Sequence, residues 1–362
     1  MGYNLNESMA SSVEFFIGLL VFWAIVLGLR NYLSRKGFSV YPFLLLWKKG
    51  TRDQWFPGLA RSRSFKVFET LSVALAIISM IGGLYLIMSS LSSLFFPAKP
   101  STVKLEPIIP GVTVGIDQAP YILLSIGISV VLHELMHAVS STSNKVPVKS
   151  GGFILLAFFP GAFVEPDETT FLESSLTAKL KIISAGIAIN LILAGIFFPL
   201  AIYLPPLLSH GIYIEGVIPN SAAYNASLHA GYVIQSVNGI AVSTPSQLKA
   251  VLESSTRYTI GLLTPNGTEL VNVTSPTHFL GVYISYYYPW YVYPFVAFFL
   301  WMFIVNFSLA LLNGAPLIIT DGGKIFTELL KRIHVSERVS MAIQGFLVLL
   351  LVLAISMSFI PQ

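Results

Sequence analysis

The chain has 362 residues, of which 54% are hydrophobic and only 10% are charged, and its mean hydropathy is +0.75. Soluble domains carry about 25% charged residues, so this composition excludes an ordinary soluble protein and indicates several membrane spans. The net charge of +4 is modest, and no nucleic-acid partner is expected. Because the chain has no cysteine, disulfides and thiolate zinc sites are excluded, and any metal must be held by His, Asp or Glu.

Long apolar runs predict the spans, because a helix needs about 20 mostly apolar residues to cross a bilayer. Six stretches meet this requirement, at residues 13–33, 68–96, 121–139, 180–204, 294–312 and 339–360. A shorter apolar piece at residues 152–164 is interrupted by Pro160 and Gly161. It is too short to span and is typical of a re-entrant or interfacial segment.

The loop between the first two predicted spans sets the orientation. Residues 30–66 contain nine basic residues and one acid, Asp53. Lysine and arginine accumulate in cytoplasmic loops, so this loop is expected in the cytoplasm, with both termini outside. The sequence therefore predicts a multi-pass protein of the cell membrane, in contact with the lipid bilayer.

Residues 207–285 do not have the sequence pattern of a membrane-spanning segment. Short β-type runs at residues 212–218, 233–238, 258–263 and 270–273 alternate with turn signals such as Asn238-Gly239. A helix is predicted at residues 246–254, capped by Ser246 or Thr244. This segment, called the outer domain below, is expected to form a small α+β domain outside the cytoplasm.

The predicted fold class is a polytopic α-helical membrane protein of about six transmembrane helices with an extracytoplasmic α+β domain. Four parts are predicted: two N-terminal spans with the basic loop (1–118), core helices (119–206), the outer domain (207–285) and the C-terminal spans (286–362).

The third predicted span contains the sequence His133-Glu134-Leu135-Met136-His137. Histidines four residues apart share one face of a helix and can occupy two positions of a tetrahedral zinc. Glu134 can then accept a proton from a metal-activated water and pass it to the leaving amine. The alternative is a pair of histidines that hydrogen-bond between helices beside a protonated glutamate. Ionisable groups inside a membrane usually mark function, which favours the metal site.

Zinc needs a third protein ligand, and the other histidines are expected in the outer domain or at the cytoplasmic face. The most suggestive acid is Asp321, which follows the fifth span after Gly314 and Pro316. Broken helix at membrane depth is tolerated only where it lines a cavity or packs on protein. The alternative reading of Asp321 is a helix N-cap at a turn.

These residues resemble the site-2 protease family of intramembrane zinc metalloproteases. The resemblance rests on the H-E-x-x-H motif, on the downstream N-x-x-P-x-x-x-x-D-G pattern of residues 313–322, and on the small-residue and asparagine motif of residues 184–190. Residues 159–164 are similar to the family's re-entrant segment, and the outer domain resembles a PDZ domain. That PDZ-like domain would either bind peptide ends or filter substrates sterically.

The resemblance implies that His133, His137 and Asp321 hold one zinc ion per chain and that Glu134 is the general base. It also implies that Asn190 and Asn313 help to hold or unwind the substrate segment. For Asn190, a hydrogen bond to another helix is an equally open alternative. The expected activity is cleavage of transmembrane segments of membrane-tethered proteins in regulated intramembrane proteolysis. The sequence departs from the family pattern at three positions, namely Ile187 in place of proline, Thr320 in place of leucine and Tyr232 in place of aspartate.

Two other functional classes remain open. A metal transporter or sensor could present the same His-Glu-His face, although transporters commonly show a second, matching half, and the sequence contains one H-E-x-x-H. An inactive scaffold could use the PDZ-like domain to hold partners.

Overall fold

The structure is a computed structural model that describes residues 5–50, 54–92 and 104–359. Five helices in this part of the chain are long and apolar enough to cross a membrane. They are α4 (Arg63–Ser90), α6 (Ala119–Ser143), α8 (Leu176–Leu208), α11 (Tyr293–Gly314) and α13 (Glu337–Ser358). Five predicted spans are therefore confirmed as helices of spanning length. In α1 (Leu5–Gly28) the apolar stretch available for this test is Val13–Gly28, which is shorter, so the first span stays a prediction.

The chain divides into two compact units, which are described separately. One contains Phe197–Leu300 and therefore the outer domain, and the other contains Ser11–Ile196 and Trp301–Gln362. The second unit, called the core unit below, also includes five short helices: α2 (Arg30–Arg35), α3 (Pro57–Ala60), η1 (Ile116–Gln118), α7 (Glu168–Glu173) and α12 (Asp321–Arg332).

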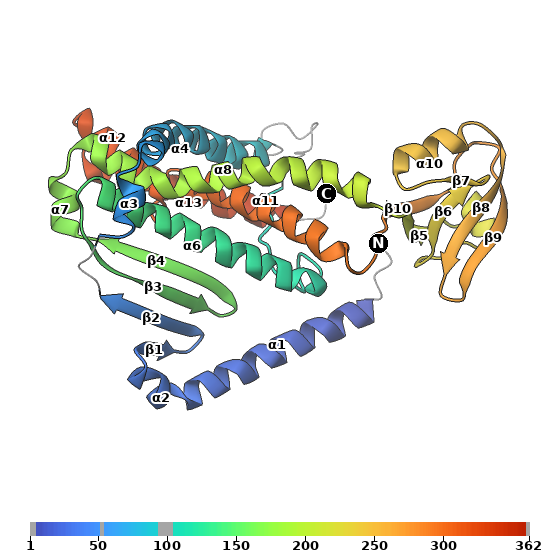
Figure 1. Cartoon of the computed structure of the whole chain (residues 1–362), viewed down its shortest axis with the longest axis horizontal. Coiled ribbons are helices and arrows are strands. Elements are labelled where there is room, and N and C mark those ends of the chain that lie inside the picture. Colours follow the sequence, from blue (N-terminus) through green and yellow to red (C-terminus); the bar gives the residue numbers. More distant parts are fainter. Residues whose placement is uncertain (1–4, 51–53, 93–103, 360–362) are drawn as a thin grey trace. The chain divides into compact units, whose positions relative to one another are not determined.

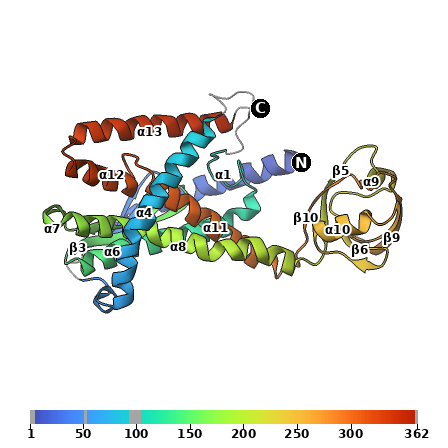
Figure 2. The same ribbon diagram turned by 90° about the horizontal axis from the view of Figure 1, so that it is seen from above.

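Helix α4 packs against several helices of the core unit (Figure 2). Small residues allow this close packing: a Cβ atom at Gly83 would lie 2.3 Å from the Leu311 carbonyl oxygen, and one at Gly314 would lie 2.6 Å from Ser79 Cβ. Ala76 of α4 also belongs to an apolar cluster that includes residues of α8 and α12. This packing fixes the end of α11, from which the chain turns into α12.

A four-stranded antiparallel sheet lies beside α6 in the core unit (Figure 1). Its strands, in spatial order, are β1 (Phe38–Tyr41), β2 (Leu44–Gly50), β3 (Val148–Leu156) and β4 (Phe159–Pro166). Part of the expected basic loop is thus strand, because β1 and β2 pair as a hairpin.

The apolar piece at residues 152–164 forms most of the β3–β4 hairpin. Its reversal lies at Ala157, which has a φ of 54°, and not at Pro160 and Gly161. Pro160 is paired with Leu155 inside β4, where it is tolerated because β4 is an edge strand. The prediction of a re-entrant or interfacial segment did not include this hairpin. A short apolar run has no periodicity that distinguishes a strand from other buried structure.

The outer domain contains an antiparallel β-sheet and two short helices. The second helix corresponds to the one predicted at residues 246–254, and the first was not predicted. Its sheet has the order β10-β5-β6-β8-β9, with β7 paired to β6. The elements are β5 (Ile212–Val217), α9 (Ala222–Asn225), β6 (Val233–Val237), β7 (Ile240–Ala241), α10 (Pro245–Leu252), β8 (Arg257–Thr264), β9 (Gly267–Thr274) and β10 (Val282–Tyr286). Thr244 caps α10, and Gln247 completes a capping box. Its PDZ-like character stays a prediction.

Candidate metal centre

Helix α6 carries His133, Glu134 and His137 within little more than one turn. Four residues separate the histidines, so both rings lie on one face, with their centroids 4.7 Å apart. His133 is only 5% exposed. The two imidazoles are therefore held side by side in a largely water-free part of the core unit.

Asp321 reaches this face from the first turn of α12. Thr320 caps that helix, because its Oγ1 accepts a hydrogen bond from the Gly323 N–H at 3.2 Å. A Cβ atom at Gly322 would lie 2.0 Å from the Gly314 carbonyl oxygen, so glycine lets α12 start directly against the end of α11. The N-cap is thus Thr320, and the Asp321 carboxylate is directed at the histidines.

The three side chains meet at the spacing expected of metal ligands. Asp321 Oδ2 lies 3.0 Å from His133 Nε2 and 3.0 Å from His137 Nε2, and the two nitrogens are 3.1 Å apart. Two ligands of a tetrahedral zinc with bonds of about 2.0–2.1 Å lie roughly 3.3 Å apart. Two imidazoles and one carboxylate are also a known donor set for catalytic zinc. These residues therefore fit a zinc ion with only a small outward shift.

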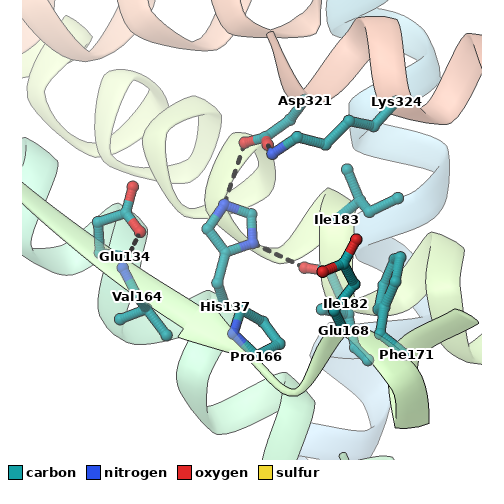
Figure 3. Close-up of a pocket in the computed structure, with 10 residues that line it drawn as sticks. All are labelled: Glu134, His137, Val164, Pro166, Glu168, Phe171, Ile182, Ile183, Asp321 and Lys324. Atoms are coloured by element: carbon teal, nitrogen blue, oxygen red, sulfur yellow. Dashed lines mark hydrogen bonds and ion pairs between the residues drawn. The ribbon is translucent and has the colours of Figure 1, made fainter. Parts of the chain in front are cut away.

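The hydrogen bond at the other nitrogen of His137 frees Nε2 for a metal. His137 Nδ1 lies 2.7 Å from the Ile182 carbonyl oxygen, which can only accept, so Nδ1 carries the proton. With a metal bound, Nε2 would then offer its lone pair on the side of Asp321, whose Oδ2 lies 3.0 Å away (Figure 3). A backbone carbonyl of α8 thereby sets the tautomer that a metal ligand needs.

Asn190 of α8 plays the corresponding part for His133. Its Nδ2 lies 3.1 Å from His133 Nδ1, while its Oδ1 is buried without a hydrogen-bond partner among the described residues. A half-turn of the amide exchanges these atoms, which are told apart by the bonds they make. With a metal on Nε2, the protonated Nδ1 would donate to Oδ1. The orphaned oxygen is therefore satisfied when His133 acts as a ligand.

Gly186 brings α8 against both rings. A Cβ atom at this position would lie 2.4 Å from His137 Nε2 and 2.7 Å from His133 Nε2. Real Cβ atoms do not approach other heavy atoms this closely, so any larger side chain would displace both nitrogens. Glycine at this position leaves the space between the ligands free.

A cavity of about 250 Å³ opens beside the ligands and is lined by residues of α6, β4, α7, α8 and α12. Glu134 faces this cavity, and its Oε2 accepts a hydrogen bond from the Val164 N–H of β4 at 3.0 Å (Figure 3). The edge strand therefore holds the predicted general base beside the candidate metal ligands.

Lys324 adds a positive charge to the centre. Its Nζ lies 3.0 Å from Asp321 Oδ1, the carboxylate oxygen that does not face the histidines. The negative charge of Asp321 raises the pKa of Lys324. This ion pair fixes the carboxylate so that Oδ2 is presented to the rings.

Asn313 is not brought to the ligands in the same way. It lies half-buried near the end of α11, next to Gly314, and it is not among the described residues that line the cavity. Its substrate-binding role stays a prediction.

Three contributors to the site lacked an assigned role at the sequence level. Lys324 follows Asp321 by three residues and so lies on the same helix face, which is a local signal. Gly186 lies within the small-residue motif, but its steric role depends on how closely two helices approach. Val164 could not be found, since its N–H reaches Glu134 only through the β3–β4 hairpin.

Residues 121–354, more than half of the chain, match peptidase family M50. An uncharacterized protein of Methanocaldococcus jannaschii is 25% identical over 344 residues, which cover 90% of this chain and 88% of that protein. The membrane-bound transcription factor site-2 protease homolog of Arabidopsis thaliana is 30% identical over 158 residues, or 41% of this chain and 31% of that protein. All residues of the centre fall within the family match. The chain therefore belongs to peptidase family M50, the site-2 protease family.

Proposed function

We propose that this chain is an intramembrane zinc metalloendopeptidase that cleaves membrane-spanning segments of substrate proteins. The proposal is carried by the meeting of His133, His137 and Asp321 at 3.0–3.1 Å between apolar helices. Glu134 lines the same cavity. Membership of a metalloprotease family supports this chemistry.

One zinc ion per chain would be held by His133 Nε2, His137 Nε2 and Asp321 Oδ2. When bound there, zinc supplies Lewis-acid chemistry that polarises a peptide carbonyl and makes water more acidic. Glu134 would accept the proton lost by the attacking water and deliver it to the nitrogen of the leaving amine. The Val164 N–H keeps the carboxylate in place for both transfers.

A spanning helix hides each peptide carbonyl in a hydrogen bond to the N–H four residues on. The substrate must therefore unwind before attack. The cavity is bordered by Val164 and Pro166 of β4, an edge strand, along which an unwound segment can lie extended. In this proposal Asn190 orients His133, and Asn313 remains the candidate contact to the unwound segment.

Water would reach the site from the side on which Glu168 and Lys324 line the cavity. Basic residues are frequent in the segments near this side, which supports a cytoplasmic orientation. They are Lys145, Lys149, Lys179, Lys181, Lys331 and Arg332. The outer domain and both termini would then lie outside the cytoplasm. The substrates we propose are membrane-tethered regulators, in keeping with the name of the Arabidopsis relative.

The test uses purified wild-type protein and the Glu134→Gln variant. Bound zinc is measured by atomic emission, and cleavage of a panel of transmembrane peptides is followed by mass spectrometry. We expect about one zinc per chain in both proteins, cleavage by the wild type, and a fall in cleavage of at least about a hundredfold for Glu134→Gln. Removal of zinc with a chelator should abolish cleavage, and added zinc should restore it.

Glu253→Gln is the matched control, because Glu253 directly follows α10 in the outer domain and its side chain is 62% exposed. It should cleave like the wild type. Wild-type protein that holds zinc yet cleaves no peptide of a broad panel would overturn the proposed activity. Equal cleavage by Glu134→Gln would overturn the role of Glu134.

A further inference from the structure

A second cavity, of about 140 Å³, adjoins the metal-site cavity. The two share Glu134 and Val164, the residues joined by the hydrogen bond between α6 and β4. None of the three proposed ligands is among the described residues that line the second cavity. It therefore begins at the general base and extends away from the metal position.

The walls of this cavity are mostly aromatic and aliphatic. Trp47 and Phe153 are cross-strand partners in β2 and β3, and their rings stack with centroids 6.0 Å apart and an interplanar angle of 21°. Trp55 and Phe163 add two more aromatic rings, and Leu135 of α6 closes the opposite wall. An apolar cavity of about 150 Å³ holds a benzene molecule. This cavity is therefore large enough for one phenyl ring or a branched aliphatic side chain.

Two glycines of β3 keep the space open. A Cβ atom at Gly151 would lie 2.9 Å from Trp55 Cη2, and one at Gly152 would lie 1.9 Å from the Trp47 carbonyl oxygen. Ala162 of β4, which pairs with Phe153, is also a small lining residue. These three small residues leave a recess beside the aromatic rings that line the same cavity.

We propose that this recess is a subsite for one bulky apolar side chain of the substrate, adjacent to the scissile bond. The inference rests on the proposed protease function. A segment whose scissile carbonyl lies at the metal ligands has its neighbouring side chains within a few ångströms of Glu134 and Val164, where the recess begins. Membrane-spanning segments are rich in leucine and phenylalanine, which match its size and its apolar walls.

Trp47 and Trp55 precede the part of the chain that matches the family, residues 121–354. The subsite is therefore built partly from the N-terminal region of this chain. It selects for a large residue by burying that side chain as the peptide bond is positioned, whereas a small residue leaves the recess unfilled.

The experiment uses full-length protein and a transmembrane peptide whose cleavage site is mapped first by mass spectrometry. The residues on either side of that bond are then varied among Ala, Val, Leu and Phe, and kcat/KM is measured for each peptide. For the wild type we expect Phe or Leu to be preferred over Ala by about tenfold or more at one of the two positions.

Ala162→Leu should fill the recess and remove most of this preference. Trp47→Ala should enlarge it and weaken the preference for Leu over Val. Leu156→Ala is the control, because this side chain is 57% exposed on β3 and is not among the described lining residues. Each preference is a ratio measured on one preparation, so a partly inactive variant does not disturb it.

An unchanged Phe-to-Ala ratio in Ala162→Leu, with wild-type zinc content, would overturn the subsite and leave the protease function standing. A second result would also overturn the subsite and leave the protease function standing. In that result the purified protein retains a lipid acyl chain in this recess, and kcat/KM is equal for the Phe and Ala peptides. A wild type that binds zinc but cleaves none of the peptides would overturn the proposed function and the subsite with it.

Discussion

Gly186 lies on α8 where this helix passes the two histidine rings, and its hydrogen atoms face the ligand nitrogens. We expect Gly186→Ala to weaken zinc binding by at least about tenfold and to abolish cleavage, since its methyl group would occupy space at both Nε2 atoms. Zinc competition with a fluorescent chelator measures the affinity. Gly195→Ala on the same helix is the control, because nothing lies within 4 Å of its Cβ position. Full zinc affinity in Gly186→Ala would contradict this geometry.

Asn190 of α8 is buried beside His133 of α6, one of the proposed ligands. Its amide lies against His133 Nδ1, so we expect Asn190→Ala to lower zinc affinity by about 10–100-fold, as loss of partners behind metal ligands typically does. Asn190→Asp keeps an acceptor for Nδ1–H and should retain more affinity. Asn306→Ala is a matched control, because this buried amide donates to Met302 of its own helix. A change in KM without a change in zinc affinity would instead favour the substrate-binding role.

At the scale of elements, α4 is tied to the C-terminal turns of α6 through a buried carboxylate. Glu69 is 0% exposed and accepts hydrogen bonds from Ser140 Oγ at 2.8 Å, Ser143 Oγ at 2.8 Å and Asn144 Nδ2 at 2.7 Å. Ser140 follows His137 by three residues. The helix that bears two proposed ligands is thus anchored just beyond them.

We expect Glu69→Ala to destabilise the protein by about 2–4 kcal/mol, because one buried and two half-buried donors lose their acceptor. Glu69→Gln keeps one acceptor oxygen and should lose less. Unfolding in detergent, followed by the fluorescence of the native tryptophans, measures both. If Glu69→Ala is as stable as the wild type, the three hydrogen bonds to Glu69 contribute nothing to the free energy of unfolding. Glu14→Ala, an exposed carboxylate of α1, controls for loss of charge.

Some features of these elements can be predicted from the local sequence, and others cannot. Spans and the His133–His137 face depend on local periodicity and on hydropathy, so the sequence predicts them directly. The β3–β4 hairpin does not follow, because an apolar run of its length fits several structures. The hydrogen bonds of Glu69 cannot be predicted either, because their donors are more than 70 residues away in the chain. Contacts of this kind depend on tertiary packing, which no local pattern encodes.

At the scale of the whole molecule, the orientation in the membrane is testable because the chain contains no cysteine, so each introduced cysteine is a unique reporter. The basic residues of 30–66 predict a cytoplasmic first loop. Ser34→Cys and Thr169→Cys, both at exposed positions of the core unit, should react with a membrane-impermeant maleimide only after cells are permeabilised. Glu253→Cys in the outer domain should react in intact cells, since that domain is proposed to lie outside. The opposite pattern would place the zinc site toward the outer side and make the outer domain cytoplasmic, where it could not screen substrates before they enter the membrane site.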